Sequence, residues 1–309
     1  MSMEVKWKYQ TILKDFNMNI LTPQVIYIET TTFCNADCVM CPHDKLSRPR
    51  ETMPDGLFNQ IIEGIREYDI SNTQVFLHKE GEPLCDENII KRISTARNVL
   101  RSAKEIGIST NAMLMSEEIA DGLLSSGIDV VFFSVDGASA ETYDQVRRNC
   151  KYETVERNIV RFLEKRNSMV RMPRVVMQML VTQENRHEQK VFVNKWEKYD
   201  VEFYFKEVHC YLDGGRSSFE KPDFANQSRC CRDPFSVLVY HVDGRVGLCC
   251  WDYNCEYVIG QAKSTDMMAL FNGGPSQYMR EKQSALDCYD VTPCNRCGRI
   301  FGKDKISEY

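Results

Sequence analysis

Residues 25–42 read VIYIETTTFCNADCVMCP, a short apolar run followed directly by three cysteines. The β-branched and aromatic run has the length and composition of a buried strand. Cys34, Cys38 and Cys41 follow with C-x3-C-x2-C spacing on the loop after that strand. Three thiolates can hold a cubane iron–sulfur cluster by three of its irons and leave the fourth iron open to another ligand. The stretch therefore predicts a strand that leads into a reactive metal centre.

A zinc site and a chance grouping of buried thiols are the alternatives for these cysteines. Structural zinc takes four ligands, and only Asp37 and His43 lie near enough in the sequence to add a fourth. The iron–sulfur interpretation is preferred because it needs no fourth protein ligand.

Further along the chain, strand-like runs alternate with segments of helical period, as in repeated βα units. The predicted strands are Val25–Glu29, Gln74–Leu77, Glu105–Ser109, Val130–Val135, Arg174–Val181 and Glu202–Glu207. The predicted helices are Asp55–Tyr68, Asp86–Ser102, Ser116–Ser125, Val155–Arg166 and Glu188–Tyr199, with Asp86 and Ser116 as N-caps. Six units predict an α/β fold, a partial (β/α)6 TIM barrel over residues 1–208, whose active site gathers at the carboxyl ends of the strands.

The rhythm changes after residue 208, where the Gly- and Ser-containing stretch 211–231 is predicted to be a linker. Two strands, Ser236–Val242 and Arg245–Leu248, are joined at Asp243-Gly244, which is a strong hairpin signal. Short helices are expected over Thr265–Phe271 and Pro275–Gln283, before a loop with Cys294 and Cys297. Residues 209–309 are therefore predicted to form a small α+β domain.

Composition and charge narrow the function classes. The 309 residues carry 39 Lys and Arg against 44 Asp and Glu, so the net charge of -5 provides no field to hold nucleic acid. The first residues lack a signal-peptide apolar core and no later run approaches the ~18 apolar residues of a spanning helix, so a cytoplasmic protein without membrane contact is expected. In that setting, 14 cysteines indicate metal ligands more than disulfides.

The cysteine loop after the first strand resembles the signature of the radical S-adenosylmethionine (SAM) superfamily. In that family the open iron binds SAM, and reductive cleavage yields a 5'-deoxyadenosyl radical that takes hydrogen from a C–H bond. Met40 stands where the family usually has an aromatic residue. The stretch Glu80-Gly81-Glu82-Pro83 resembles the GGEP motif, with Glu80 in place of the first glycine. The resemblance implies that Gly81, Glu82 and Pro83 receive the SAM ammonium.

Two later strand ends extend the resemblance. Ser109 and Asn111, in the sequence STN, resemble the family's ribose-contacting cluster. Ser134 and Asp136 in SVDG, with Arg147 on a following helix, resemble the SPASM and twitch subgroup, in which these groups bind SAM and Arg its carboxylate. Four motifs in the family's order make a chance match improbable.

A second group of cysteines lies in the C-terminal region, at positions 230, 231, 249, 250, 255, 288, 294 and 297. The hairpin and the C-x2-C knuckle select Cys231, Cys249, Cys294 and Cys297, with Cys230 and Cys250 as open alternatives to their neighbours. Their spacing resembles the twitch domain, which implies a second [4Fe-4S] cluster beside the catalytic one. A four-cysteine zinc knuckle is the alternative. Cys85, Cys150, Cys210, Cys255 and Cys288 are interpreted as core or incidental residues.

The resemblance extends to 2-deoxy-scyllo-inosamine dehydrogenases and aminoglycoside epimerases, which implies a sugar, aminocyclitol or aminoglycoside substrate. The leading hypothesis is oxidation of a secondary alcohol to a ketone, with the auxiliary cluster accepting an electron and flavodoxin or ferredoxin as the reductant. The alternatives are an epimerase in which Cys250 returns the hydrogen atom, a peptide-modifying enzyme, and a non-catalytic zinc-binding module. Cys250 is equally interpreted as a small buried hydrophobe. Candidates for an acidic substrate lining are Glu207, His209, Asp213, Trp251 and Asp252.

Overall fold

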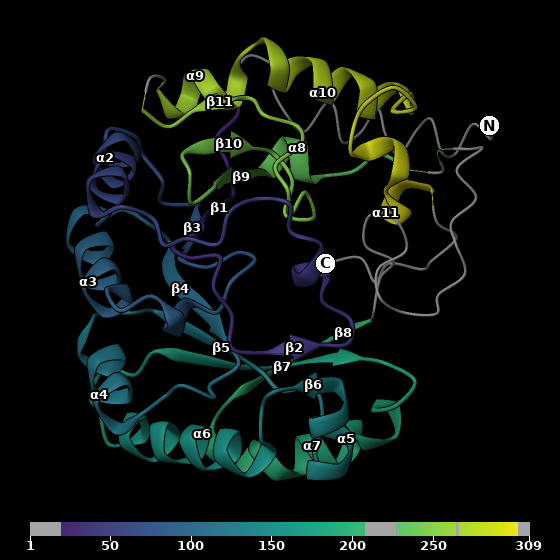
Figure 1. The fold of residues 1–309 in the computed structure, drawn as a ribbon. Helices are drawn as coiled ribbons and strands as arrows, with labels where there is room; N and C mark the ends of the chain where they lie inside the picture. Colours follow the sequence, from purple (N-terminus) through teal and green to yellow (C-terminus); the bar gives the residue numbers. More distant parts are fainter. Residues whose placement is uncertain (1–19, 208–226, 228, 264–265, 302–309) are drawn as a thin grey trace.

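The computed structural model describes residues 20–207, 227, 229–263 and 266–301 (Figure 1). Its centre is one nine-stranded sheet of order β11-β10-β9-β1-β3-β4-β5-β7-β8. The six predicted strands are confirmed as β1 Val25–Ile28, β3 Gln74–Phe76, β4 Glu105–Thr110, β5 Val130–Ser134, β7 Arg174–Val181 and β8 Glu202–Glu207. All neighbours among these six run parallel and the described sheet does not close, so the partial barrel is confirmed.

Helices cover the outside of the curved sheet, as Figure 1 shows. They are α2 Asp55–Arg66, α3 Ile89–Val99, α4 Glu117–Ser125, α5 Ala140–Val146, α6 Tyr152–Asn167 and α7 Gln189–Trp196. Ser116 caps α4 as predicted, because its hydroxyl accepts from the Ile119 amide. The Asp86 prediction is wrong: Asn88 is the N-cap of α3, and the Asp86 carboxylate instead accepts from the Asn88 amide. A turn of 3-10 helix over Pro83–Cys85 delays the start of α3.

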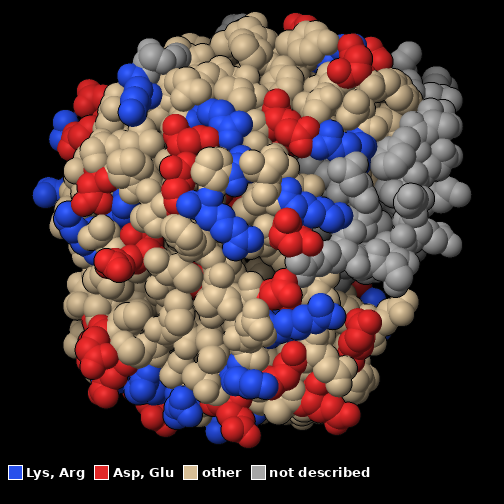
Figure 2. Space-filling model, viewed as in Figure 1, with Lys and Arg blue, Asp and Glu red and all other residues tan. Residues whose placement is uncertain are grey.

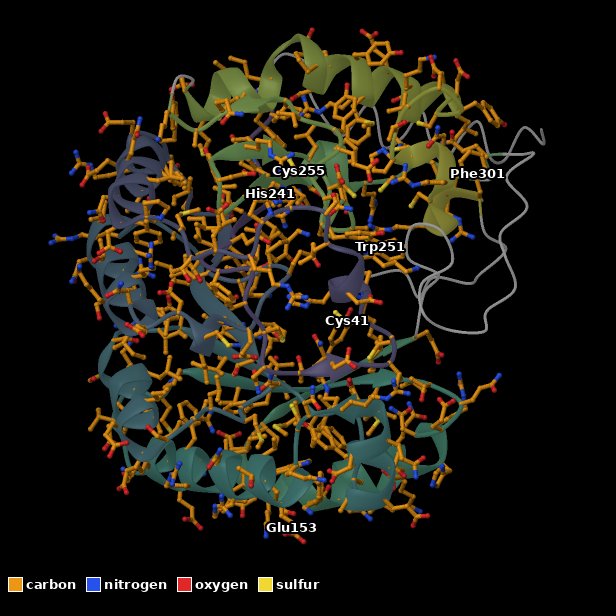
Figure 3. The ribbon with its side chains drawn as sticks, viewed as in Figure 1. Cys41, Glu153, His241, Trp251, Cys255 and Phe301 are labelled. Atoms are coloured by element: carbon orange, nitrogen blue, oxygen red, sulfur yellow. The ribbon has the colours of Figure 1, made fainter. Side chains whose placement is uncertain are left out.

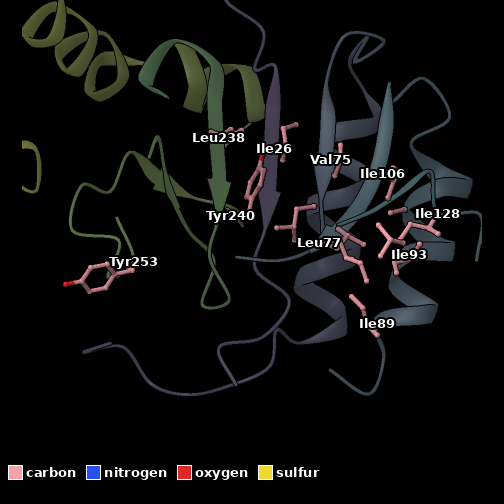
Figure 4. Close-up of a cluster of buried hydrophobic side chains, with 14 of the residues drawn as sticks. Ile26, Val75, Leu77, Ile89, Ile93, Ile106, Ile128, Leu238, Tyr240 and Tyr253 are labelled. Atoms are coloured by element: carbon pink, nitrogen blue, oxygen red, sulfur yellow. The ribbon is translucent and has the colours of Figure 1, made fainter. Parts of the chain in front are cut away.

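The main core lies between the sheet and these helices. Figure 4 shows Val75, Leu77 and Ile106 of the sheet region near Ile89 and Ile93 of α3, and all five side chains are buried. Burying a side chain of this size contributes about 1.5–3 kcal/mol. This layer therefore holds the strand ends, and the side chains on them, in fixed positions.

The C-terminal region continues the same sheet. The hairpin is confirmed as β9 Val237–Tyr240 and β10 Arg245–Gly247, with Gly244 at φ +87° in the turn. β9 pairs in parallel with β1 from Val25↔Val237 to Ile28↔Tyr240, so the sheet crosses the boundary expected near residue 208. The remaining elements are α8 Asp233–Ser236, β11 Gly260–Gln261, α9 Met267–Asn272, α10 Gly274–Ala285 and α11 Gly298–Phe301. Most of the predicted linker lies outside the described residues, and the division into two domains stays a prediction.

Three short strands were missed in the sequence: β11, and two strands that pair with each other. β2 Asp37–Cys38 pairs antiparallel with β6 Arg147–Arg148, so Arg147 lies just beyond α5 and not on a helix as predicted. The face drawn in Figure 2 carries basic and acidic side chains interspersed with one another. Within the described part of the chain, no helix has the length and apolarity needed to span a bilayer.

Candidate iron–sulfur and SAM site

The three N-terminal cysteines lie together at the carboxyl end of β1. The Cys41 amide donates to the Cys38 carbonyl over 3.1 Å, and the charges of Cys34 and Cys38 both act on the Cys41 thiol. Burial raises the pKa of Cys34 and Cys41 to about 12. His43 Nε2 lies 2.8 Å from the Thr32 carbonyl oxygen, which engages that nitrogen with the backbone. No His, Cys, Asp or Glu group of three suited to a single ion occurs among the described residues.

A buried ion pair closes the base of the cysteine loop. Arg48 donates to both carboxylate oxygens of Glu29, each over 2.8 Å, and neither side chain is more than 3% exposed. Arg48 Nε also donates to the Tyr253 carbonyl over 2.8 Å. Burial alone would raise the pKa of Glu29, but His241, whose Nδ1 lies 3.4 Å from Glu29 Oε2, and the hydrogen bonds from Arg48 hold this pKa well below its usual range. The pair thus joins the two ends of the loop to each other and to the C-terminal region.

The GGEP-like segment packs directly on this loop. A side chain at Gly81 would overlap the carbonyl oxygens of Thr31 and Phe33, which explains the need for glycine. The buried Glu82 carboxylate accepts from Thr110 Oγ1 over 2.5 Å and from the Asn111 amide over 2.8 Å. Glu82 therefore ties the end of β3 to the end of β4. Glycine at position 81 therefore lets this segment pack against the backbone of the cysteine loop.

The remaining candidate residues gather around the same loop. Ser109 Oγ and Ser134 Oγ are 3.0 Å apart, and Asn111 Nδ2 donates to Asn35 Oδ1 of the cysteine loop over 3.0 Å. Arg147 Nε donates to Asp136 Oδ2 over 2.7 Å. The other Asp136 oxygen accepts from the Leu180 amide over 2.7 Å. Asp136 is fully buried and aligns Arg147 beside the cysteines.

The sequence comparison with known families agrees with this geometry. The family model described as the radical SAM superfamily matches residues 28–192. The chain belongs to the radical SAM superfamily. A GTP 3',8-cyclase of Desulforamulus reducens is 27% identical over 165 residues, which cover 50% of this chain and 46% of that protein. The chain thus matches less than half the length of this radical SAM relative.

Solved structures extend the shared fold beyond the family match. BtrN, solved in complex with AdoMet and 2-DOIA, has a TM-score of 0.60 at 17% identity over 89% of this chain and 92% of that chain. AnSMEcpe with bound AdoMet has a TM-score of 0.68 at 16% identity over 88% of each chain. The radical SAM chain therefore shares its fold with these proteins in the C-terminal region as well as in the barrel.

The second cysteine group of this radical SAM enzyme surrounds one cavity. All four selected cysteines, Cys231, Cys249, Cys294 and Cys297, line it, together with mainly apolar residues such as Leu248 and Ile300. Cys230 and Cys250 do not line it. The Trp251 amide donates to Cys249 Sγ over 3.3 Å, and Gln283 Nε2 to Cys294 Sγ over 3.4 Å. Four thiols with N–H donors around them fit the donor set of an iron–sulfur cluster.

Cys250 points to different partners. Its thiol donates to Asp233 Oδ2 over 3.1 Å, and Asp233 Oδ1 accepts from Arg299 over 2.7 Å. The charges of Lys79 and Lys206 also act on this thiol, and both residues belong to the barrel. Alternation after β10 therefore turns Cys249 to the cavity and Cys250 toward the barrel. Figure 3 shows Cys41 near the middle of the molecule and Trp251 on its C-terminal side.

The described candidates for an acidic substrate lining have partners within the protein or line the four-cysteine cavity. Glu207 is exposed and paired with Arg186 over 2.7 Å. Asp252 is buried and accepts from the Glu256 and Tyr257 amides, each over 2.9 Å. Trp251 lines the four-cysteine cavity instead, while His209 and Asp213 lie outside the described residues. Glu207 therefore forms a surface ion pair, and Asp252 holds the backbone of a loop in place.

Proposed function

We propose that this radical SAM enzyme is a dehydrogenase that removes hydrogen from a C–H bond of a sugar, aminocyclitol or aminoglycoside and converts a secondary alcohol to a ketone. The observation that carries the proposal is the cavity lined by Cys231, Cys249, Cys294 and Cys297. When bound, a cluster on the N-terminal cysteines together with SAM would supply a 5'-deoxyadenosyl radical, and a second cluster in this cavity an electron acceptor.

The chain's own residues have different proposed roles in binding the catalytic cluster and SAM. Cys34, Cys38 and Cys41 would hold the catalytic cluster and leave one iron for SAM. The Gly81 backbone, Ser109, Asn111, Ser134 and Arg147 would contact SAM, and Pro83 shapes the turn after Glu82. Glu82 and Asp136 stay predicted SAM-binding residues, and their carboxylates also accept hydrogen bonds within the protein.

The proposed partners are a small-molecule substrate and a reducing electron donor such as flavodoxin or ferredoxin. The solved complex of BtrN with AdoMet and 2-DOIA supports a small molecule, because its fold covers 89% of this chain. SuiB of Streptococcus suis, bound to precursor peptide SuiA, shares the fold at a TM-score of 0.68 and keeps the peptide-modifying alternative open. The non-catalytic alternative requires zinc in the cysteine sites, which metal analysis of the purified protein tests.

A second candidate function is epimerisation. It is favoured by Cys250, whose thiol lies outside the four-cysteine cavity and is held by Asp233 beside barrel residues. In this reaction the thiol would return a hydrogen atom to the opposite face of the substrate carbon, and the thiyl radical left on Cys250 would be reduced to the thiol by one electron from the proposed reducing donor together with a proton.

One experiment separates these reactions. Anaerobically reconstituted and reduced protein is incubated with SAM and candidate sugars, aminocyclitols and aminoglycosides in deuterated water. A ketone formed with one 5'-deoxyadenosine per turnover supports the dehydrogenase. Deuterium retained at a carbon of inverted configuration supports the epimerase and overturns the dehydrogenase.

A further inference from the structure

The inner face of the barrel can be followed along β8. Phe203 and Phe205 contact Phe192 of α7, with ring centroids 6.1 and 5.9 Å apart, so both point outward to the helices. Side chains alternate along a strand, which turns Tyr204 and Lys206 to the interior. Tyr204 accordingly packs with the inner cluster of Phe76, Val130 and Val176. Lys206 lies two residues nearer the carboxyl end of β8 than Tyr204, at the end of the barrel where SAM and substrate must meet.

The inner cluster forms an aromatic floor. The ring of Tyr27 stacks on Phe76 with centroids 5.7 Å apart, and Phe132 meets Phe76 edge-on at 5.7 Å. His78 lies above them, 5.6 Å from Phe76. Flat apolar faces beneath a few polar groups are typical of small-molecule sites.

The polar layer above this floor includes neutral hydrogen-bonding groups. The Ser109 amide donates to His78 Nδ1 over 3.1 Å, so the neutral ring carries its hydrogen on Nε2. Burial, with the charge of Lys79, lowers the pKa of His78 to about 3 and keeps it neutral. Gln178 Nε2 donates to Ser134 Oγ over 3.4 Å. Neutral donors and acceptors of this kind can bind several hydroxyls without a charge.

The acidic and basic side chains around this layer differ in whether they have partners among the described residues. The carboxylates at the strand ends already have partners: Glu29 with Arg48, Glu80 with Lys79, Asp136 with Arg147, and Glu82 with Thr110 and Asn111. Lys206 is half-buried and has no ion pair with any described residue. Its ammonium acts on the Cys250 thiol, so it lies on the side of the interior that faces Cys250. An ammonium in a partly desolvated interior favours an anion beside it.

We propose that the barrel interior binds a polyhydroxylated substrate that carries an anionic oxygen group, a phosphate or a carboxylate, and that Lys206 binds this group. The proposal rests on the proposed function, because it takes the interior as the substrate site. It selects acidic sugars over amine-bearing ones, for which the described interior offers no unpaired carboxylate.

The test compares four probes that share one ring: D-glucose, D-glucosamine, D-glucose 6-phosphate and D-glucuronate. Binding to the reconstituted full chain with SAM is measured by calorimetry for the wild type, Lys206→Met and Lys190→Met. Lys190 is an exposed lysine of α7 and controls for the loss of one positive charge. The wild type should bind at least one of the two anionic probes about tenfold more tightly than glucose or glucosamine.

Lys206→Met should lose this preference while its affinity for glucose stays the same, and Lys190→Met should keep it. The phosphate and carboxylate arms show which anion is preferred. Binding of none of the probes, tighter binding of glucosamine, or an unchanged preference in Lys206→Met overturns the proposal. An equal loss for all four probes in Lys206→Met also overturns it, because the lysine would then act on SAM or on folding. Formation of 5'-deoxyadenosine by the wild type without sugar reports separately on the SAM cleavage that the proposed function requires.

Discussion

The two cysteine groups of this chain are built in different ways. Cys34, Cys38 and Cys41 lie on one continuous loop after β1, and that loop is braced by Gly81 and by the Glu29–Arg48 pair. Cys231, Cys249, Cys294 and Cys297 come from three separate segments and enclose one cavity. Three ligands on one loop would leave a position for SAM, whereas four ligands from distant segments would also hold the chain together. We therefore expect the first group to govern SAM cleavage, and the second to govern stability and the electron-accepting step of ketone formation.

The largest expected effect is loss of chemistry in Cys38→Ala. Removal of one of only three ligands should abolish reductive cleavage of SAM, measured as 5'-deoxyadenosine formed by the reconstituted, reduced protein. Cys85→Ala is the matched control, because Cys85 lies close enough to Cys34 to affect its pKa but is not a proposed ligand. Wild-type yields of 5'-deoxyadenosine in Cys38→Ala would remove the distinction between the two groups.

The next effect concerns the brace that connects the two regions. Glu29→Gln leaves Arg48 buried without its counter-charge and should cost about 3–5 kcal/mol of unfolding free energy. The pKa of Glu29 is lowered in the folded state, so the carboxylate stabilises fully above its unfolded pKa of about 4.3 and loses this contribution as the pH falls below it.

Urea unfolding of metal-free wild type and Glu29→Gln between about pH 7 and about pH 3 measures this linkage. The difference in unfolding free energy should be largest at the neutral end and shrink on acidification. A difference that grows on acidification would show that the Glu29 carboxylate is not stabilised in the folded protein.

A smaller loss is expected for Cys294→Ser in the second group. The free energy of unfolding of the reconstituted variant should fall by about 1–3 kcal/mol, which is measured as a lower unfolding temperature. The variant should still cleave SAM, because the cavity lies apart from the N-terminal loop. Cys230→Ser is the control, since Cys230 does not line the cavity. Full stability with complete loss of SAM cleavage in Cys294→Ser would reverse the roles assigned to the two groups.

The smallest effect on dehydrogenase activity is expected for Cys250→Ala. This substitution tests whether Cys250 belongs with the cysteines that line the cavity. Ketone formation should stay within about threefold of wild type, because Cys250 is not one of the residues that line the cavity. Product analysis with and without the substitution provides the measurement. If inverted product disappears while 5'-deoxyadenosine is still made, the thiol is the hydrogen donor of an epimerase.

Local patterns predicted much of this arrangement. Alternation of strand and helix signals located all six barrel strands, and the distances along the chain selected the four cysteines that line the cavity. No comparable sequence pattern indicated the contacts between residues far apart in the chain. Glu29 and Arg48 are both ordinary surface residue types, and nothing in their spacing indicates a buried pair. The Glu82 motif suggested a ligand contact, but only the three-dimensional structure shows its carboxylate bonded to the end of β4.

The parallel pairing of β9 with β1 has a consequence for how the chain is made. Until residues 237–240 leave the ribosome, the apolar VIYI strand has an unprotected edge of free amide and carbonyl groups. The nascent barrel would therefore expose an aggregation-prone strand edge until a segment more than two hundred residues later is synthesised. Truncation before β9 should thus yield aggregates in place of a smaller soluble enzyme.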